Sequence, residues 1–362
     1  MAVGCEMSEP SGGSDTAPIR QEEQFDEAAV ARYLRAEVPD LVGESDIAFD
    51  QFPGGKANLT YRAVAGDTEI VLRRAPLGAV ARGSHDMERE YTILSRLWEA
   101  YPPAPRAYHF CSDPTVMGKP FFVMERRRGY VVRGRWPDSW PEDDRAIRHR
   151  AARNLVAALA GLHEVDPGSV GLGDFGHPEG FVERQVDGWE RRWVAARTRS
   201  IPEMDAVSRI LRSGAPRPQT ATILHNDFKL DNTMLSSRGE VVAVFDWDMA
   251  TRGDPLVDLG TLLAYWADEE RSMFSVLGED AVSIASYLTR DGVIAEYGEL
   301  TGRDLSGIRY YEGLALYRLA VIVEQIFARY SAGQTTDDRF AAFGPLPPIV
   351  AAAALEALEG ND

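Results

Sequence analysis

The segment 224–254, LHNDFKLDNTMLSSRGEVVAVFDWDMATRGD, constrains the fold more than any other part of this 362-residue chain. It contains the pattern H-x-D-x-x-x-x-N, formed by His225, Asp227 and Asn232, and an apolar run then leads to Asp246. A short apolar run between polar residues is typical of a buried strand. Asp246 lies 19 positions after Asp227, which fits a β-hairpin that returns the chain to the same loop.

The residue types in this pattern fit phosphoryl transfer from ATP. An aspartate in such a loop can orient an attacking hydroxyl and accept its proton. Amide and carboxylate oxygens are suitable ligands for the Mg²⁺ that accompanies nucleotide phosphates. We therefore interpret Asp227 as the catalytic base and Asn232 and Asp246 as metal ligands. The structural alternative for each is a turn-forming or capping side chain.

Three neighbouring residues are expected to support this loop. Lys229 lies two residues after the proposed base, where a cation would stabilise charge on the transferred phosphoryl group, although an exposed solubilising lysine is the alternative. His225 is expected to brace the loop by a hydrogen bond and to do no chemistry. Asp258 is expected to begin a helix or to tie the loop down from below.

The composition limits the classes of partner. A net charge of −17 argues against nucleic acid or an anionic membrane as the main partner, and it fits either a cationic substrate or an acidic, solubilising surface. Only Cys5 and Cys111 are present, which fits a reducing cytoplasm. We find no apolar run of about 20 residues and no signal pattern at the N-terminus. The expectation is a cytoplasmic monomer or homodimer.

The chain divides by pattern into four parts. Residues 1–20 are rich in Ser, Gly, Pro and acidic residues, which predicts a disordered tail. Residues 21–125 are predicted to form a β-rich lobe, and residues 126–145 an irregular hinge and connector. Residues 146–362 carry mostly helical patterns around the motif loop. The predicted class is α+β.

Within the β-rich lobe the order of patterns indicates a small sheet with one crossing helix. Strand patterns cover residues 47–52, 59–65 and 69–74. A helical pattern follows at 86–100, and a short buried strand at 121–124 ends the lobe.

The motif region resembles the aminoglycoside phosphotransferase family, whose bilobal fold is similar to that of protein kinases. The family's typical H-G-D-F-R-L-D-N corresponds to HNDFKLDN at 225–232, and its D-W-E-x-A-x-x-G-D-P-x-x-D-L to DWDMATRGDPLVDL at 246–259. The stretch is most similar to the kinase-like domains found alone in bacteria or attached to acyl-CoA dehydrogenases. Over residues 25–360 the resemblance implies a small β-rich lobe and a larger helical lobe. It also implies ATP or GTP with Mg²⁺, and a small-molecule hydroxyl as acceptor.

The resemblance places phosphate contacts in the hairpin at 52–61. Gly54 and Gly55 would let the backbone approach phosphate oxygens, and Asn58 or Thr60 would donate hydrogen bonds. The segment departs from G-x-G-x-x-G, and a Gly-Gly pair between strands is usually only a turn.

An arginine stands where kinases carry a phosphate-binding lysine. Arg73 keeps the charge and can bind two phosphate oxygens, but with a different geometry. The adjacent Arg74 would point to the other face of the strand, so Arg73 has the better register. On the following helix Glu90 is the expected ion-pair partner of Arg73, with Glu88 as the alternative.

The hinge and the helical lobe carry further candidates. Backbone groups of Met124, Glu125 and Arg126 are expected to bind the adenine edge. Nearby arginines could bind an anionic substrate group or could simply balance local acids: Arg126, Arg127, Arg128, Arg133 and Arg135. Four aromatic residues could line an acceptor site or pack between helices: Trp189, Trp193, Tyr265 and Trp266.

The sequence thus predicts an ATP- and Mg²⁺-dependent phosphotransferase acting on a small-molecule hydroxyl. One alternative is a hydroxyacyl-CoA-type kinase, which the arginine cluster favours. The acidic net charge favours a cationic, aminoglycoside-like acceptor instead. The other alternative is a non-catalytic nucleotide-binding pseudokinase, suggested by Arg73 and the atypical glycine pair.

Overall fold

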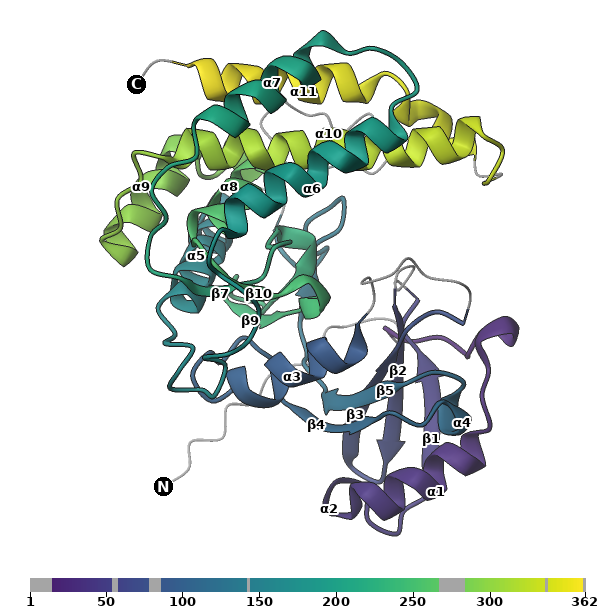
Figure 1. The fold of residues 1–362 in the computed structure, drawn as a ribbon. Helices are drawn as coiled ribbons and strands as arrows, with labels where there is room; N and C mark the ends of the chain where they lie inside the picture. The colour runs from purple at the N-terminus through teal and green to yellow at the C-terminus, as the bar shows by residue number, and fades with distance from the viewer. Residues whose placement is uncertain are drawn as a thin grey trace. The chain divides into compact units, whose positions relative to one another are not determined.

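The computed structural model describes residues 15–53, 58–77, 86–141, 144–266, 284–335 and 338–360. These residues form two compact units (Figure 1). The first contains the chain up to Gly129 together with the short segment Phe245–Asp248. The second contains Tyr130–Val244 and the chain from Met249 onward.

The first unit is built on a five-stranded antiparallel sheet with the strand order β1-β2-β3-β5-β4. Its strands are β1 (Ile47–Gln51), β2 (Leu59–Ala65), β3 (Thr68–Arg74), β4 (Ala107–Cys111) and β5 (Phe121–Glu125). The β2–β3 turn contains Gly66 at φ 60°, a left-handed conformation that glycine adopts without strain. Four of the strands were predicted, and β4 was not.

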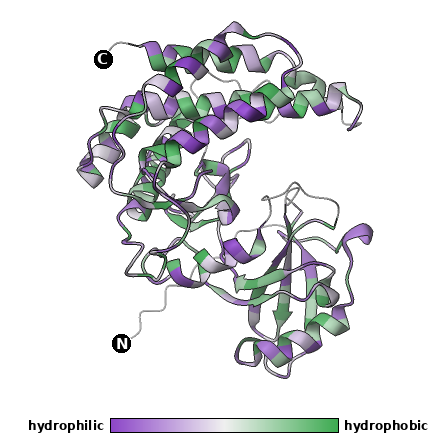
Figure 2. Ribbon diagram, viewed as in Figure 1, coloured by the Kyte–Doolittle hydropathy of each residue, from purple (hydrophilic) through white to green (hydrophobic). Residues whose placement is uncertain are grey.

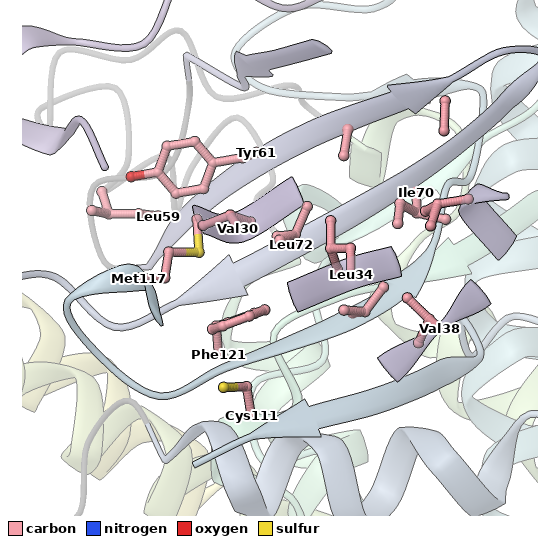
Figure 3. Packing of buried hydrophobic residues seen from close by; sticks show 14 residues of the cluster. Val30, Leu34, Val38, Leu59, Tyr61, Ile70, Leu72, Cys111, Met117 and Phe121 are labelled. Atoms are coloured by element: carbon pink, nitrogen blue, oxygen red, sulfur yellow. The ribbon is translucent and has the colours of Figure 1, made fainter. Parts of the chain in front are cut away.

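Helices of the first unit cover part of this sheet and carry one functional side chain on α3. They are α1 (Glu27–Glu37), α2 (Pro39–Val42), α3 (Met87–Leu97) and α4 (Pro114–Met117), preceded by a 3-10 turn, η1 (Gln21–Glu23). Val30 and Leu34 of α1 pack against Leu72 and Phe121 of the sheet, and all four are fully buried (Figure 3). Their removal from water, at about 25 cal/mol per Å² of apolar surface, holds α1 on the sheet.

The end of the expected tail instead lies along β1. Ala17 forms an antiparallel bridge with Gln51, and the backbone N–H of Arg20 donates to Oε1 of Gln51 at 3.1 Å. The backbone bridge and the hydrogen bond to the Gln51 side chain hold this polar, Pro-containing segment along β1. Residues 1–14 of the predicted tail lie outside the described residues.

Arg74 is a buried structural residue of this unit. Its guanidinium donates to the Tyr61 hydroxyl at 2.7 Å and to the backbone carbonyls of Glu23 and Met117. A buried guanidinium is tolerated when its N–H groups find acceptors. Arg74 therefore serves packing, while Arg73 points to the other face of β3, as its register predicted.

The second unit is mainly helical. Its helices are α5 (Arg145–His163), α6 (Phe181–Ala196), α7 (Pro202–Ser213), α8 (Leu256–Ala264), α9 (Arg290–Thr301), α10 (Ile308–Ser331) and α11 (Leu346–Glu359). Figure 2 shows apolar and polar residues side by side on these helices, as expected for helices with one buried face. α8 and α10 cross closely at Gly260, where a Cβ atom would lie 2.5 Å from the carbonyl carbon of Tyr311.

Two small antiparallel sheets in the second unit carry the motif loop. One pairs β7 (Thr222–Leu224) with β10 (Thr251–Gly253), and the other has the order β6 (Tyr130–Val131), β8 (Thr233–Leu235), β9 (Val241–Val244). The β8–β9 hairpin is the one predicted from the spacing of the motif. With a β-rich first unit and a mainly helical second unit, the α+β class is confirmed.

One described segment meets the length and hydropathy criteria for a membrane span. Phe340–Glu359 has a mean hydropathy of 1.5 over its apolar window, which corrects the expectation that no run approaches 20 residues. The helix within it, α11, has 14 residues and spans roughly 21 Å, less than the ~30 Å of a hydrocarbon core. Its residues Val350, Ala351 and Ala354 are buried against the neighbouring helices.

Candidate functional site

The loop between β7 and β8 brings three predicted site residues into contact. The Asp227 carboxylate accepts a hydrogen bond from Nδ2 of Asn232 at 2.8 Å, and its Oδ2 lies 3.0 Å from Nζ of Lys229. Nδ2 of Asn232 also donates to the backbone oxygen of Asp227 at 2.8 Å. The loop is therefore closed on itself, and the Asp227 carboxylate is held by an amide and a cation.

Lys229 is largely buried, which removes the exposed-lysine alternative. Its side chain is 18% exposed, and Nζ lies 4.7 Å from the ring centroid of Tyr265. Burial alone would lower the pKa of Lys229, but its neighbours Tyr265, Asp227 and Asp231 raise the pKa overall. The ammonium group is therefore a fixed positive charge beside the Asp227 carboxylate.

Asn232 leaves one polar atom for a ligand. Both hydrogen bonds of its amide use Nδ2 as the donor. Within the described parts of the chain, no group donates to its Oδ1. An amide oxygen of this kind is a ligand that Mg²⁺ accepts, so the side chain fits the predicted metal-binding role.

Buried Asp258 ties the loop to α8, as predicted. Its Oδ2 accepts from the backbone N–H of His225 at 2.6 Å, and its Oδ1 accepts from that of Asn226 at 2.7 Å. Asn226 has φ 65°, a left-handed conformation in which Asn is among the better-tolerated non-glycine residues. This explains the glycine that the family pattern carries there. The Asn226 side chain donates to the Met249 oxygen at 2.9 Å.

His225 braces the loop from within, as predicted. It is fully buried, and its Nδ1 accepts from the backbone N–H of Asp227 at 3.3 Å. Its ring meets Phe228 edge to face, with centroids 5.9 Å apart. His225 therefore fixes the backbone on both sides of Asn226.

Sequence reasoning missed two residues that support this loop from helices. His163, the last residue of α5, is buried with Nε2 3.4 Å from Oδ2 of Asp258 and Nδ1 2.7 Å from the Tyr297 hydroxyl. Arg318 of α10 donates from Nη2 to the backbone oxygen of Asn226 at 3.1 Å. A polar residue in an otherwise apolar helical pattern is the one sequence signal that marks both positions.

In the first unit, Arg73 joins Glu90 and Asp246. Nε of Arg73 donates to Oε2 of Glu90 at 2.9 Å, and its Nη2 pairs with Oδ1 of Asp246. The predicted Arg73–Glu90 ion pair is therefore present, and the alternative partner Glu88 is exposed. Burial raises the pKa of Glu90 to about 7, against the lowering effect of Arg73, and the carboxylates of Asp246 and Asp248 also raise it.

Asp246 occupies a left-handed turn at the end of β9. Its φ is 68°, and its side chain is 32% exposed. Arg73 binds Oδ1, whereas no described residue donates to Oδ2. One carboxylate oxygen therefore has room for a metal ion, which fits the predicted role.

The predicted phosphate-covering hairpin is only partly described. Gly54 and Gly55 lie outside the described residues. Asn58 is buried, with 2% of its surface exposed. Thr60 is the cross-strand partner of Arg73, and cross-strand partners share a face of the sheet.

The predicted hinge residues make contacts within the first unit. Met124 is buried in β5 opposite Val71. The backbone N–H of Glu125 donates to the oxygen of Arg106 at 2.8 Å, so this group is already used in the sheet.

Most arginines of the 126–135 cluster are neutralised by carboxylates. Arg126 pairs with Asp15 and lies 3.7 Å from Glu69, and its guanidinium stacks 4.7 Å from the Phe52 centroid. Three further arginine–carboxylate pairs are Arg127 with Glu125, Arg128 with Glu69 and Arg135 with Asp138. These pairs support the connector interpretation and remove the argument for an anionic substrate at this cluster.

The four predicted aromatic residues differ in their surroundings. Trp266 is buried and donates from Nε1 to the Leu288 oxygen at 2.7 Å, so it packs helices. Trp189 and Trp193 are buried on α6. Tyr265 alone contacts the motif loop, through Lys229.

Comparison with known proteins gives one consistent result. Residues 48–299 match the family model described as the phosphotransferase enzyme family. Acyl-CoA dehydrogenase family member 10 of Mus musculus is 29% identical over 90% of this chain and 30% of its own length. Acyl-CoA dehydrogenase family member 11 of Gallus gallus is 28% identical over 94% of this chain and 44% of its own length. The chain thus spans less than half of these relatives.

Solved structures share the fold. A protein from Ralstonia eutropha, named as a candidate aminoglycoside phosphotransferase, superposes with a TM-score of 0.75 at 28% identity, covering 93% of this chain and 99% of that one. A thermostable mutant aminoglycoside phosphotransferase in complex with ADP and hygromycin B gives a TM-score of 0.56 at 15% identity, covering 90% of this chain and 100% of that one.

Proposed function

Because the chain belongs to the phosphotransferase enzyme family, we propose that it transfers the γ-phosphate of ATP to a hydroxyl group of a small molecule. The observation that carries this proposal is the Asp227 carboxylate, held between the Lys229 ammonium and the Asn232 amide. A fixed carboxylate with a neighbouring cation is the arrangement that hydroxyl activation and phosphoryl-charge stabilisation require.

Each residue has a distinct part in this reaction. Asp227 accepts the hydrogen bond of the attacking hydroxyl and takes its proton as the O–P bond forms. Lys229 holds the Asp227 carboxylate at 3.0 Å and offsets negative charge on the transferred group. Asn232 in the second unit, through Oδ1, and Asp246 in the first, through Oδ2, would each be a ligand for Mg²⁺, which would supply neutralisation of phosphate charge.

Arg73 is the proposed phosphate-binding residue of the first unit. Its guanidinium is positioned by Glu90 on α3 at 2.9 Å, as a kinase lysine is positioned by a helix glutamate. Similar folds have been solved with ADP or AMP-PNP together with hygromycin B, which supports nucleotide binding by this fold. Thr60, the cross-strand neighbour of Arg73, is a further candidate donor to the phosphates.

A hydroxyacyl-CoA acceptor is the second candidate. The observation favouring it is that curated relatives matching 90% or more of this chain are named acyl-CoA dehydrogenase family members. An antibiotic acceptor has the support of similar solved structures that are named aminoglycoside phosphotransferases, and of the acidic net charge. Both candidates use the same donor side.

A transfer assay decides between activity and its absence. The full-length protein is incubated with γ-labelled Mg·ATP and a panel of aminoglycosides, hydroxyacyl-CoA thioesters and amino alcohols, and label on the acceptor is measured. We expect transfer by the wild type and none by Asp227→Ala or Asp246→Ala. Equal turnover in the wild type and both variants would reject the assignment. Nucleotide binding without transfer would favour a non-catalytic nucleotide-binding protein.

A further inference from the structure

Arg318 is a buried cation that contacts the backbone of the proposed catalytic loop. It lies on α10 with 7% of its surface exposed. Its Nη2 donates to the backbone oxygen of Asn226 at 3.1 Å, and Asn226 immediately precedes Asp227. A group bound by Arg318 would therefore lie beside the proposed base.

The charge of Arg318 is not balanced by an ion pair within the described residues. A guanidinium carries five N–H donors, and here one of them has an acceptor, a neutral carbonyl. No described carboxylate lies within the 4.0 Å of a salt bridge. Burial lowers the pKa of Arg318 against the raising effect of Tyr265, Asp227 and Asp258, and an arginine stays protonated in proteins. Burying a charge without a counter-charge is unfavourable.

Three other arginines of the same unit pair with carboxylates. Arg290 on α9 pairs with Glu312. Arg303 lies 3.2 Å from Glu164. Arg199 lies 3.6 Å from Glu324 of α10. These three arginines have a carboxylate partner, whereas Arg318 has none in the described residues and has nitrogens left for a ligand.

Arg318 keeps 7% of its surface exposed, and within the described residues its Nε and Nη1 make no hydrogen bond. The Trp189 ring lies 5.5 Å from the Arg318 guanidinium, and Arg192 stacks on the same ring at 4.3 Å. Arg192 is exposed and, like Arg318, forms no ion pair with a described residue. Two unpaired guanidinium groups thus share one indole ring.

We propose that Arg318, assisted by Arg192 at the Trp189 ring, binds an anionic group of the acceptor molecule. The chemistry that fits a guanidinium fork is a carboxylate or a phosphate ester. This inference rests on the proposed function and names its substrate class. The acceptor is a hydroxylated organic anion, and the bound anion supplies an ion-pair partner for Arg318.

Direct titration with inorganic anions tests the subsite without knowledge of the acceptor. Sulfate and inorganic phosphate are titrated into the nucleotide-free, full-length protein by calorimetry, with chloride holding the ionic strength constant. We expect saturable binding to the wild type and at least a tenfold weaker affinity in Arg318→Gln. Arg329→Gln is the matched control: Arg329 lies on the same helix, has a single backbone acceptor and is exposed, so wild-type affinity is expected. No saturable binding to the wild type, or equal binding to Arg318→Gln, would overturn the proposal.

Two further variants keep the test decisive if Arg318→Gln fails to fold. Arg318→Lys retains the charge and one donor for the Asn226 oxygen but loses the fork, so we expect several-fold weaker binding. Arg192→Gln changes an exposed residue and should weaken binding two- to threefold. Wild-type affinity in both folded variants would show that the anion does not bind at these guanidinium groups.

Repeating the titration with saturating Mg·AMP-PNP separates the two sources of such an anion. An acceptor subsite predicts that sulfate affinity is unchanged by the nucleotide. Competition would assign the site to nucleotide phosphates and overturn the acceptor assignment. Nucleotide affinity is measured in the same samples. Nucleotide binding without the anion site would reject this inference alone, whereas loss of nucleotide binding would reject the proposed function. Sulfate binding through Arg318 without phosphoryl transfer would support an anion site but reject its assignment to an acceptor.

Discussion

The two units each place a cation beside a proposed functional carboxylate, but they hold it differently. In the first unit Arg73 is shared between Glu90, whose side chain is 2% exposed, and the more accessible Asp246. In the second unit Lys229 contacts Asp227 and the face of Tyr265, without a second ion-pair partner in the described residues. Arg73 is positioned by buried Glu90 in addition to Asp246, whereas the ion-pair partner of Lys229 is Asp227 itself.

The comparison teaches where each site takes its rigidity from. Asp246 depends on a buried charge pair, because Glu90 orients Arg73 and also accepts from the backbone N–H of Trp247 at 3.4 Å. Asp227 depends on backbone anchoring, because Asp258 accepts from both preceding N–H groups. Removing the cation should therefore lower stability more in the first unit than in the second. Removing the carboxylate should lower turnover most in the second unit.

The largest expected effect is that of Asp227→Asn on turnover. The amide keeps the shape and a hydrogen-bond acceptor but does not take a proton, so we expect kcat to fall by about 10²–10⁴-fold. Nucleotide affinity and thermal stability should change little. The measurement is label transfer from Mg·ATP, beside nucleotide titration. Asp166→Asn, in an exposed turn of the same unit, is the control. A kcat within threefold of the wild type would exclude Asp227 as the base.

Next in size is the contrast between Arg73→Met and Lys229→Met in stability. Arg73→Met leaves buried Glu90 without its cation, which should cost about 3 kcal/mol, since breaking a buried pair exposes an uncompensated charge. Lys229→Met leaves the partly exposed Asp227, and we expect about 1 kcal/mol or less. Urea unfolding at pH 8 measures both. Equal losses would show that burial of the partner does not separate the two pairs.

The sequence predicted the parts of these sites that depend on local spacing. Asp227, Asn232 and Lys229 meet because one loop contains them all, and Arg73 meets Glu90 because strand register and helix periodicity place both. The register of the β8–β9 hairpin follows from its apolar run. Short local constraints of this kind are readable in a single chain.

Long-range support was not predictable in the same way. Arg318 reaches a loop 92 positions away, and His163 reaches Asp258 across 95 positions. Only the packing of α10 and α5 decides these contacts, and a lone polar residue in an apolar helix leaves several partners open. The arginine cluster left two interpretations open for the same reason. The carboxylates that neutralise Arg126 come from distant segments, Asp15 and Glu69.

A smaller effect concerns the pH dependence of the first unit. Burial holds the pKa of Glu90 near 7 in the folded protein, above its ordinary value of 4.5. The folded state therefore binds a proton that the unfolded state has lost. This stabilisation is complete below about pH 4.5 and disappears as the pH rises through 7, by at most about 3 kcal/mol.

Glu90→Gln should remove this pH dependence while keeping a hydrogen bond to Arg73. Between pH 5.5 and 8 the melting temperature of the wild type should therefore fall relative to that of the variant. Glu88→Gln, two residues away and exposed, should follow the wild type. Parallel melting curves of the wild type and Glu90→Gln across this range would contradict a raised Glu90 pKa.

The smallest expected effect concerns the left-handed backbone at Asn226, a conformation that Asp246 also adopts. Asn226 and Asp246 have φ 65° and 68°, the two positive values among non-glycine residues in the described chain. Asn226→Gly relieves a strain of about 1 kcal/mol and loses the hydrogen bond to the Met249 oxygen, worth about 1 kcal/mol, so stability should change by less than about 1 kcal/mol.

Asn226→Ala loses the same bond and keeps the strain, so it should be less stable than Asn226→Gly by about 1 kcal/mol. Urea unfolding of the two variants measures this difference. If the two are equally stable, the left-handed conformation costs nothing there. If Ala is the weaker, the loop stores strain beside Asp227 that its anchors overcome.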